Sequence, residues 1–413
     1  MRTSFRSVFI ALVIGTALIV AALIVNARRP AVEVRQPSAD LVEASGKCAE
    51  CHTRETSAIV IEYRRSHHAQ QGVTCLDCHR PVKGQGTVEH RGFTIADTVT
   101  PANCASCHDA EYKQFERSRH AAPAWAAVYG SAPFTAEQVA YAEQYQPGAV
   151  KRPPNALVQS EGPSAITAGC ATCHAVGRPH ADGSIGSCTV CHARHSASVA
   201  LARLPTTCGQ CHMGPDHSQL EIYSESKHGV LFALRRNQLN LDAKPKQLTT
   251  ADMSVPTCAT CHMSGLGGMN VTHDVTERLS WYLFEAVSHP RPDFAQARAR
   301  MQEMCGNCHA SPQVKSFFAQ GDSVVAATNA KVAASLALMD SLKKEGLLTA
   351  APFDQPIDFV AFDLWHYYGR TTKHGAFMGG ADFTQWHGNY ELVAKTVELN
   401  AMAAELRAAH RRR

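Results

Sequence analysis

The chain has 413 residues, 45% of them hydrophobic, and a formal net charge of +4, so it is long enough for one large or several small domains. Its dense basic run is the tail 410–413, and a charge this small does not indicate a nucleic-acid partner. Sixteen cysteines are many for this length, and they become the main evidence for the class of protein.

An apolar run at the start of the chain, residues 7–25, follows the basic segment MRTSFR. This pattern is typical of an export signal, and the run is close to the length of a membrane span. We therefore expect residues 1–27 to be a signal peptide or a membrane anchor. The anchor is slightly favoured, although 25–27 also suits a cleavage site. Residues 28–46, with two prolines and mixed charge, are predicted to be a linker.

All sixteen cysteines fall in eight Cys-x-x-Cys-His motifs. This motif attaches c-type haem: both thiols form thioethers with the haem, and the histidine binds the iron as the proximal ligand. Zinc ribbons and redox-active disulfides also use Cys-x-x-Cys, but neither requires a histidine after every pair. The sequence therefore predicts eight covalently bound haem c groups in an octahaem domain, residues 47–310. The motif residues are Cys48, Cys51 and His52; Cys75, Cys78 and His79; Cys104, Cys107 and His108; Cys170, Cys173 and His174; Cys188, Cys191 and His192; Cys208, Cys211 and His212; Cys258, Cys261 and His262; and Cys305, Cys308 and His309.

Segments between and after the motifs have the apolar spacing and end signals of helices. Strand patterns are sparse. The expected fold class is therefore mainly α: a loop-rich octahaem domain followed by a C-terminal helical segment, residues 311–413, that contributes to haem ligation and to oligomer contacts. The predicted helices are 136–145, 294–304, 323–344, 358–368 and 391–410.

Fourteen of the 22 histidines remain once the eight motif histidines are set aside. An electron-transfer haem takes a second axial ligand, usually another histidine in multihaem chains. If one haem stays open for substrate, seven distal histidines are needed. The predicted distal ligands are His68, His90, His120, His195, His228, His273 and His387. Close alternatives are His67, His366 and His374, whereas His180, His289 and His410 are expected at the surface.

A carboxylate and an imidazole stand side by side at Asp216 and His217, just after the sixth motif. A histidine oriented by a carboxylate is a common arrangement for proton transfer near pH 7. The pair also suits an ordinary turn after Pro215, and His217 alone could serve as an axial ligand. From the residues alone, the catalytic interpretation and the turn are about equally favoured.

Four segments carry a resemblance to a known family: MGPDHSQLEIYSESKHG, PTCATCHMSGLGGMNVTHDVTERLSW, MCGNCHASPQV and HGAFMGGADFTQWHGNYEL. They resemble the hydroxylamine oxidoreductase family of octahaem cytochromes c, over about residues 48–392. The last five motifs also resemble those of the pentahaem cytochrome c nitrite reductases. The resemblance implies that the haem at Cys170, Cys173 and His174 is catalytic, with an open face lined by Asp216 and His217. It further implies seven bis-histidine haems, a homotrimer and a periplasmic location.

One position departs from that family. Hydroxylamine-oxidising members carry a tyrosine that crosslinks to the catalytic haem of a neighbouring subunit, and this chain aligns Phe383 there, in GGADFTQWHG. A benzene ring is not expected to form the bond, and members without it are thought to run as reductases. We therefore expect reduction of nitrite and/or hydroxylamine to ammonium. The alternatives are a hydroxylamine dehydrogenase that forms nitric oxide or nitrite, and a non-catalytic electron carrier.

The expected redox partner is a soluble c-type cytochrome or a membrane quinol-oxidising cytochrome. The expected location is the periplasmic side of the inner membrane, or the soluble periplasm if the N-terminal segment is cleaved.

Overall fold

The computed structural model describes residues 9, 13–21, 24 and 39–412. The predicted signal or anchor at 1–27 therefore lies largely outside the described residues, as does the first part of the predicted linker. Within the described ranges, we find no helix with the length and apolar character needed to span a membrane. Residues 39–46, the second part of the predicted linker, form the start of a helix, α2 (Ala39–Glu55).

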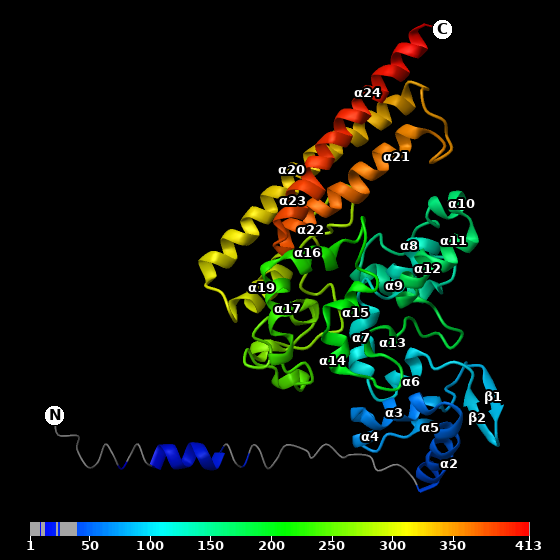
Figure 1. Cartoon of the computed structure of the whole chain (residues 1–413), viewed down its shortest axis with the longest axis vertical. Coiled ribbons are helices and arrows are strands. Elements are labelled where there is room, and N and C mark those ends of the chain that lie inside the picture. The colour runs from blue at the N-terminus through cyan, green and yellow to red at the C-terminus, as the bar shows by residue number, and fades with distance from the viewer. Residues whose placement is uncertain (1–8, 10–12, 22–23, 25–38, 413) are drawn as a thin grey trace, which may run out of the picture.

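The mainly α fold class is confirmed, and the described residues contain one two-stranded sheet. Figure 1 shows α2–α5 and the strands at one end, the motif-rich region in the middle, and the long C-terminal helices at the other end. The first elements are α3 (Ser57–Arg65), α4 (His67–Gln70), α5 (Cys75–His79), β1 (Thr87–His90), β2 (Phe93–Ala96), α6 (Pro101–Ala105), α7 (Asp109–Glu116), α8 (Ala122–Tyr129) and α9 (Ala136–Tyr145). The middle elements are α10 (Leu157–Glu161), α11 (Pro163–Ala168), α12 (Cys170–His174), η1 (Ala175–Gly177), α13 (Thr189–His192), α14 (Val199–Arg203), α15 (Pro205–Gly209), α16 (Gln219–Glu225), α17 (Lys227–Arg235), η2 (Arg236–Gln238), η3 (Pro245–Gln247), α18 (Cys258–His262) and η4 (Leu266–Gly268). The last are α19 (Phe294–Gly306), α20 (Ser311–Lys344), α21 (Pro356–Asp363), η5 (Leu364–Gly369), α22 (Arg370–Met378), α23 (Ala381–Thr384), η6 (Gln385–Tyr390) and α24 (Glu391–Arg411).

Several haem motifs form single helical turns, as in α5, α12 and α18. One turn brings side chains three residues apart onto one face, so the two thiols of a motif lie together. The α5 turn is fixed at its start, where the backbone N–H of Thr74 donates to Asp77 Oδ2 at 2.7 Å. Short caps of this kind hold the motif in place where a longer helix is absent.

The small sheet presents one predicted ligand. Strands β1 and β2 pair antiparallel, with His90 opposite Phe93, and the two residues between them have positive φ, 53° at Arg91 and 87° at Gly92. Two positive φ values define the tight hairpin turn that matches the twist of the strands. The turn places His90 at the tip of the ribbon.

The C-terminal helices form a bundle of their own, visible in Figure 1. Helices α20, α21 and α24 contact one another around buried Val332, Leu342, Leu364, Leu392 and Leu399. Helix α24 closely matches the prediction for 391–410, whereas the segment predicted as 358–368 divides into α21 and the π-helix η5.

Helix α20 starts at residue 311, not at the predicted 323, because Gly321 does not interrupt it. A Cβ at Gly321 would lie 2.6 Å from the Phe377 ring, so this glycine allows α20 to approach α22 closely. Lys373, also on α22, is fully buried, and its Nζ donates to Glu285 O at 2.9 Å and to Ser288 Oγ at 2.7 Å. These contacts hold α22 against the loop 281–290.

Candidate haem sites and active site

One connected cavity of about 2520 Å³ runs through the motif-rich region. Every motif contributes its histidine and at least one cysteine to the lining. Pockets for a single small molecule are typically about 300–1,000 Å³, so this cavity has room for more than one large group. The motifs therefore face a shared interior, as expected for several haems packed together.

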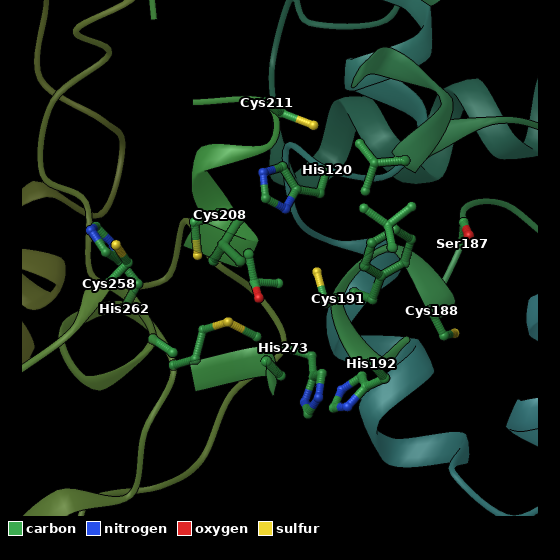
Figure 2. Close-up of a pocket in the computed structure, with 18 of the residues that line it drawn as sticks. His120, Ser187, Cys188, Cys191, His192, Cys208, Cys211, Cys258, His262 and His273 are labelled. Atoms are coloured by element: carbon green, nitrogen blue, oxygen red, sulfur yellow. The ribbon is translucent and has the colours of Figure 1, made fainter. Parts of the chain in front are cut away.

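Within this cavity the structure brings together motif histidines and predicted distal histidines from distant parts of the chain. Five such pairs have ring centroids about 6 Å apart. They are His52–His90 at 6.0 Å, His108–His68 at 6.0 Å, His212–His120 at 5.9 Å, His192–His273 at 6.3 Å and His309–His228 at 5.9 Å. Figure 2 shows His192 and His273 with their rings turned toward each other.

These separations fit a metal ion between two imidazoles. A metal–nitrogen bond of about 2 Å on each side, plus about 1 Å from each nitrogen to its ring centre, gives about 6 Å. Burial lowers the pKa of His120 to about 3 and that of His212 to about 4. Both rings are therefore neutral at pH 7, which is the form that binds iron.

The second motif has a predicted distal ligand, His195, beside it on a strained loop. His195 lies close enough to His79 to act on its pKa, which burial and then this neighbour lower. The backbone around His195 is left-handed at three non-glycine residues, with φ of 44° at Ala193, 65° at His195 and 41° at Ala197. Such strain in non-glycine residues occurs where a function requires a particular side-chain direction. Here it turns His195 back toward the second motif.

His387 is the predicted distal ligand that the structure does not bring to a motif. Its side chain is 61% exposed on η6 and forms an ion pair with Asp382, Nε2 to Oδ2, at 3.0 Å. It does not line the cavity, whereas its alternatives His366 and His374 do. Three motifs have no facing histidine ring among the described pairs: the second at His79, which has His195 nearby, the fourth at His174 and the seventh at His262. The choice between His67 and His68 favours His68, since the His67 side chain is half exposed and pairs with Asp242 at 3.1 Å.

Thiols of different motifs adjoin one another, which shows which motifs are neighbours. Hydrogen bonds with the thiols of Cys188 and Cys258, together with burial, raise the pKa of Cys104 and Cys208 respectively. At five other junctions burial is the largest cause of a raised cysteine pKa, and a thiol of the neighbouring motif raises that pKa further. The affected cysteine and its neighbour are Cys75 and Cys48, Cys78 and Cys104, Cys191 and Cys208, Cys211 and Cys173, and Cys261 and Cys305. The motifs thus adjoin in the order one, two, three, five, six, seven, eight, and the fourth branches from the sixth. Figure 2 shows Cys191 and Cys208 from two adjoining motifs at one part of the cavity.

Several buried donors beside the motifs have no hydrogen-bond partner within the described residues. They include Nε of Arg119 and Arg291 and the hydroxyl of Tyr282. The two guanidinium groups lie over the Tyr282 ring, at 4.7 Å and 4.6 Å from its centroid. A buried donor without a partner is unfavourable, so these groups call for acceptors. The carboxylates of haem propionates suit them, and the donor set therefore fits covalently bound haem c.

The fourth motif differs from the others in what faces it. His174 Nδ1 donates to Ala124 O at 2.5 Å, which leaves Nε2 free for iron. Among the described ring pairs, none joins His174 to a second histidine; Asp216 and His217 instead lie close enough to act on its pKa, which burial lowers. Asp216 and His217 also line the cavity.

Asp216 and His217 form a tight pair, with His217 Nδ1 2.6 Å from Asp216 Oδ2. Burial opposes ionisation of Asp216, but the hydrogen bond and charge interaction with His217, with smaller contributions from His366 and the Arg370 guanidinium, outweigh burial and lower its pKa. The carboxylate is therefore charged at neutral pH. It fixes the tautomer of His217 in which Nδ1 carries the proton and donates to Asp216, which leaves Nε2 as the nitrogen that can accept a proton.

The loop that carries the pair is fixed by helix α22. Thr371 Oγ1 donates to Pro215 O at 3.3 Å and lies 3.2 Å from Ser218 Oγ. Gly214, with φ of 84°, provides the left-handed turn just before it. The loop that carries Asp216 and His217 is therefore held between the sixth motif and α22.

Three further side chains complete this part of the cavity. The Phe284 ring lies 5.1 Å from the His217 ring and 4.7 Å from His374. His366 accepts a hydrogen bond at Nε2 from Arg370 Nη1 at 2.8 Å. The sequence pattern held His366 and His374 only as alternative iron ligands and gave no signal for Phe284 or Arg370.

Comparison with known proteins agrees with this description. The family described as "Seven times multi-haem cytochrome CxxCH" matches residues 71–356. A "Probable nitrite reductase-hydroxylamine oxidoreductase fusion protein" of Kuenenia stuttgartiensis is 30% identical over an alignment of 253 residues, and the match covers 52% of this chain and 25% of that protein. The chain thus spans about a quarter of the length of this relative. A "Cytochrome c-552" of Desulfotalea psychrophila is 34% identical over 55 residues, 13% of this chain and 11% of that protein.

Two solved structures share the fold. One, titled "Hypothetical multiheme protein", has a TM-score of 0.78 at 22% identity and covers 92% of this chain and 99% of its own. The other, "Kuenenia stuttgartiensis reducing HAO-like protein complex Kustc0457/Kustc0458", has a TM-score of 0.68 at 19% identity and covers 91% of this chain and 88% of its own. With its motifs turned into one cavity and its histidines paired across it, the chain belongs to the multihaem cytochrome family with Cys-x-x-Cys-His motifs and carries covalently bound haem c.

Proposed function

We propose that the protein is a periplasmic octahaem cytochrome c of the hydroxylamine oxidoreductase family that reduces nitrite and/or hydroxylamine to ammonium at the fourth motif. The observation that carries this proposal is the Asp216–His217 pair beside His174, whereas five other motifs have a facing histidine ring about 6 Å away. The name of the 30% identical relative, which includes both activities, supports the reaction class.

The chain's own residues fit proton delivery. The haem at the fourth motif supplies an open coordination position and electrons when it is bound. Asp216 holds the Nδ1–H of His217, so the other ring nitrogen can pass protons to the oxygen atoms that leave as water. Asp216 also stabilises the imidazolium that forms when His217 takes up its next proton.

The branch point of the motifs suits this role. The fourth motif adjoins the sixth at Cys173 and Cys211, and the sixth leads to the remaining motifs on both sides. Reduction of nitrite to ammonium needs several electrons in one catalytic cycle. A catalytic site connected to the middle of the haem series can receive them from either arm.

The proposed direction rests on Phe383. Its ring lies 4.9 Å from His387 on the neighbouring helix and has no phenol oxygen for a crosslink. The alternative is a hydroxylamine dehydrogenase, in which another tyrosine supplies the crosslink or none is needed. Phe383 supports the reductase.

A paired assay tests the direction. On one preparation, nitrite reduction by reduced viologen is expected to be faster than hydroxylamine oxidation by an added acceptor. Phe383→Tyr is expected to leave the rank order unchanged unless intact-mass analysis shows a new crosslink. Faster oxidation by the wild-type protein, together with a crosslinked haem peptide, would favour the dehydrogenase.

A non-catalytic electron carrier is the second candidate. It is favoured by the His212–His217 ring separation of 6.2 Å, which would also allow His217 to bind the sixth iron. His120, however, lies 5.9 Å from His212 and is better buried for that role. A protein that binds no carbon monoxide when reduced, and that has a purely low-spin electron paramagnetic resonance spectrum when oxidised, would favour the carrier.

We also propose a homotrimer. Trp386, Tyr390, Val393 and Val397 follow one another at helical spacing along η6 and α24, and each is at least 43% exposed. A continuous apolar stripe on a helix supports an oligomer contact. Sedimentation of the holoprotein measures this directly. The redox partner is proposed to be a soluble c-type cytochrome or a quinol-oxidising membrane cytochrome, and no nucleic acid is involved.

A further inference from the structure

Arg370 is a partly buried guanidinium beside the Asp216–His217 pair, and neither proton delivery nor electron transfer uses it. It is the first residue of α22 and lines the cavity together with His217 and His366. Burial lowers its pKa to about 10, and the charge of Asp216 opposes this change. It is therefore a cation at neutral pH.

Its contacts fix the orientation of the guanidinium and leave one end free. Nε donates to Phe284 O at 2.8 Å, and Nη1 donates to His366 Nε2 at 2.8 Å. The planar group lies 5.3 Å above the Phe284 ring centroid and 5.1 Å from that of Trp365. Nη2 makes no hydrogen bond to any part of the chain that the structure describes. The side chain is thus held on two sides and presents one donor group.

The carboxylate nearest to this donor is already engaged. Asp216 Oδ2 accepts the hydrogen bond of His217 at 2.6 Å, so this single carboxylate already has a partner. A second arginine, Arg152, lines the same cavity and acts on both Arg370 and His174. Glu161 acts on Cys170 but is not part of the cavity lining. The space between the pair and His174 therefore has an excess of positive charge.

We propose that Arg370 binds the anionic substrate through Nη2 and makes the site prefer nitrite, an oxyanion, to neutral hydroxylamine. Guanidinium groups form strong, directional hydrogen bonds to oxyanions, whereas a neutral ligand gains little from the charge. His366 and Phe284 position Arg370 and do not touch the substrate. This inference rests on the proposed function, since it assigns the oxyanion subsite of the same active site.

The test compares an anionic with a neutral ligand in the holoprotein. Nitrite is titrated into wild type, Arg370→Gln and Arg370→Lys while the visible spectrum is followed. Carbon monoxide is titrated into the same three proteins after they have been reduced. Arg370→Gln is expected to raise the Kd for nitrite by about tenfold or more, the range for a lost hydrogen bond to a charged group. The Kd for carbon monoxide is expected to stay within about twofold, and Arg370→Lys to recover part of the nitrite affinity.

His366→Leu tests the positioning role. It removes the acceptor of Nη1, so we expect a smaller rise in the Kd for nitrite and no further rise when it is added to Arg370→Gln. This non-additivity is the signature of residues that act through one another. If His366→Leu raised the Kd for nitrite and for carbon monoxide equally, the positioning role would be overturned.

The outcomes separate this inference from the proposed function. Equal loss of nitrite and carbon monoxide binding in Arg370→Gln, or no change in either, would overturn the subsite. A wild-type protein that binds neither ligand would instead overturn the proposed function. Should Arg370→Gln fail to mature, Arg370→Lys still decides. A nitrite Kd above the wild-type value with an unchanged carbon monoxide Kd supports the subsite, because lysine keeps the charge but not the guanidinium geometry. An unchanged nitrite Kd, or an equal loss of both ligands, overturns it.

Discussion

Replacement of His217 by glutamine is expected to lower kcat for nitrite reduction by about a hundredfold or more, the usual contribution of a positioned proton donor. Glutamine preserves a polar side chain of similar size but cannot take up and release a proton at neutral pH. The pairing of His217 with the charged Asp216 at 2.6 Å is the physical reason for so large an effect. The measurement is steady-state nitrite reduction with reduced viologen.

His289→Gln is the matched control. His289 is also paired with a carboxylate, Glu285 at 2.8 Å, but its side chain is 56% exposed and does not line the cavity. Its kcat is expected to equal that of the wild type. If His217→Gln retained wild-type kcat while its visible spectrum changed at the sixth haem, His217 would be an axial ligand and the proton-transfer role would be wrong.

Loss of the fourth haem is expected to abolish activity. In a Cys170→Ser, Cys173→Ser variant the thioethers cannot form, so intact mass is expected to fall by one haem. Nitrite reduction and carbon monoxide binding should both disappear, because the fourth motif is the one that faces Asp216 and His217. Intact mass of the wild type also tests the expected total of eight haems directly.

The seventh motif provides a demanding control for this variant, because His262 too has no facing histidine ring among the described pairs. Cys258→Ser, Cys261→Ser is expected to lose one haem by mass and to slow electron delivery, while the reduced protein still binds carbon monoxide. The opposite result, with ligand binding lost only in the seventh-motif variant, would place the open haem at His262 and contradict the proposed active site.

Local features of the sequence predicted much of this fold. The helix at 136–145 and the helix that closely matches 391–410 follow from apolar spacing and end signals within one segment. The start of α20 and the division at η5 did not follow, because both depend on contacts with other elements. Gly321, for example, suggests a break in the chain but serves as a close contact with Phe377.

The distal histidines show the same limit. The sequence offered His68 and His120 as partners for unnamed motifs, and only the tertiary structure set them opposite His108 and His212. The tertiary structure left the predicted ligand His387 exposed in an ion pair with Asp382. The two histidines that suit one iron have ring centroids about 6 Å apart across the cavity, and no spacing along the chain encodes that separation.

The sequence by itself determined the sites of covalent attachment, since the whole attachment motif, two cysteines and a histidine, lies within five residues. It also determined that Asp216 and His217 are neighbours. The tertiary structure decided what these neighbours face, because the loop after the sixth motif and helix α22 bring them to His174 and set Phe284, His366 and Arg370 around them. Bond formation within a motif is local, whereas an active site between haems depends on where distant segments pack.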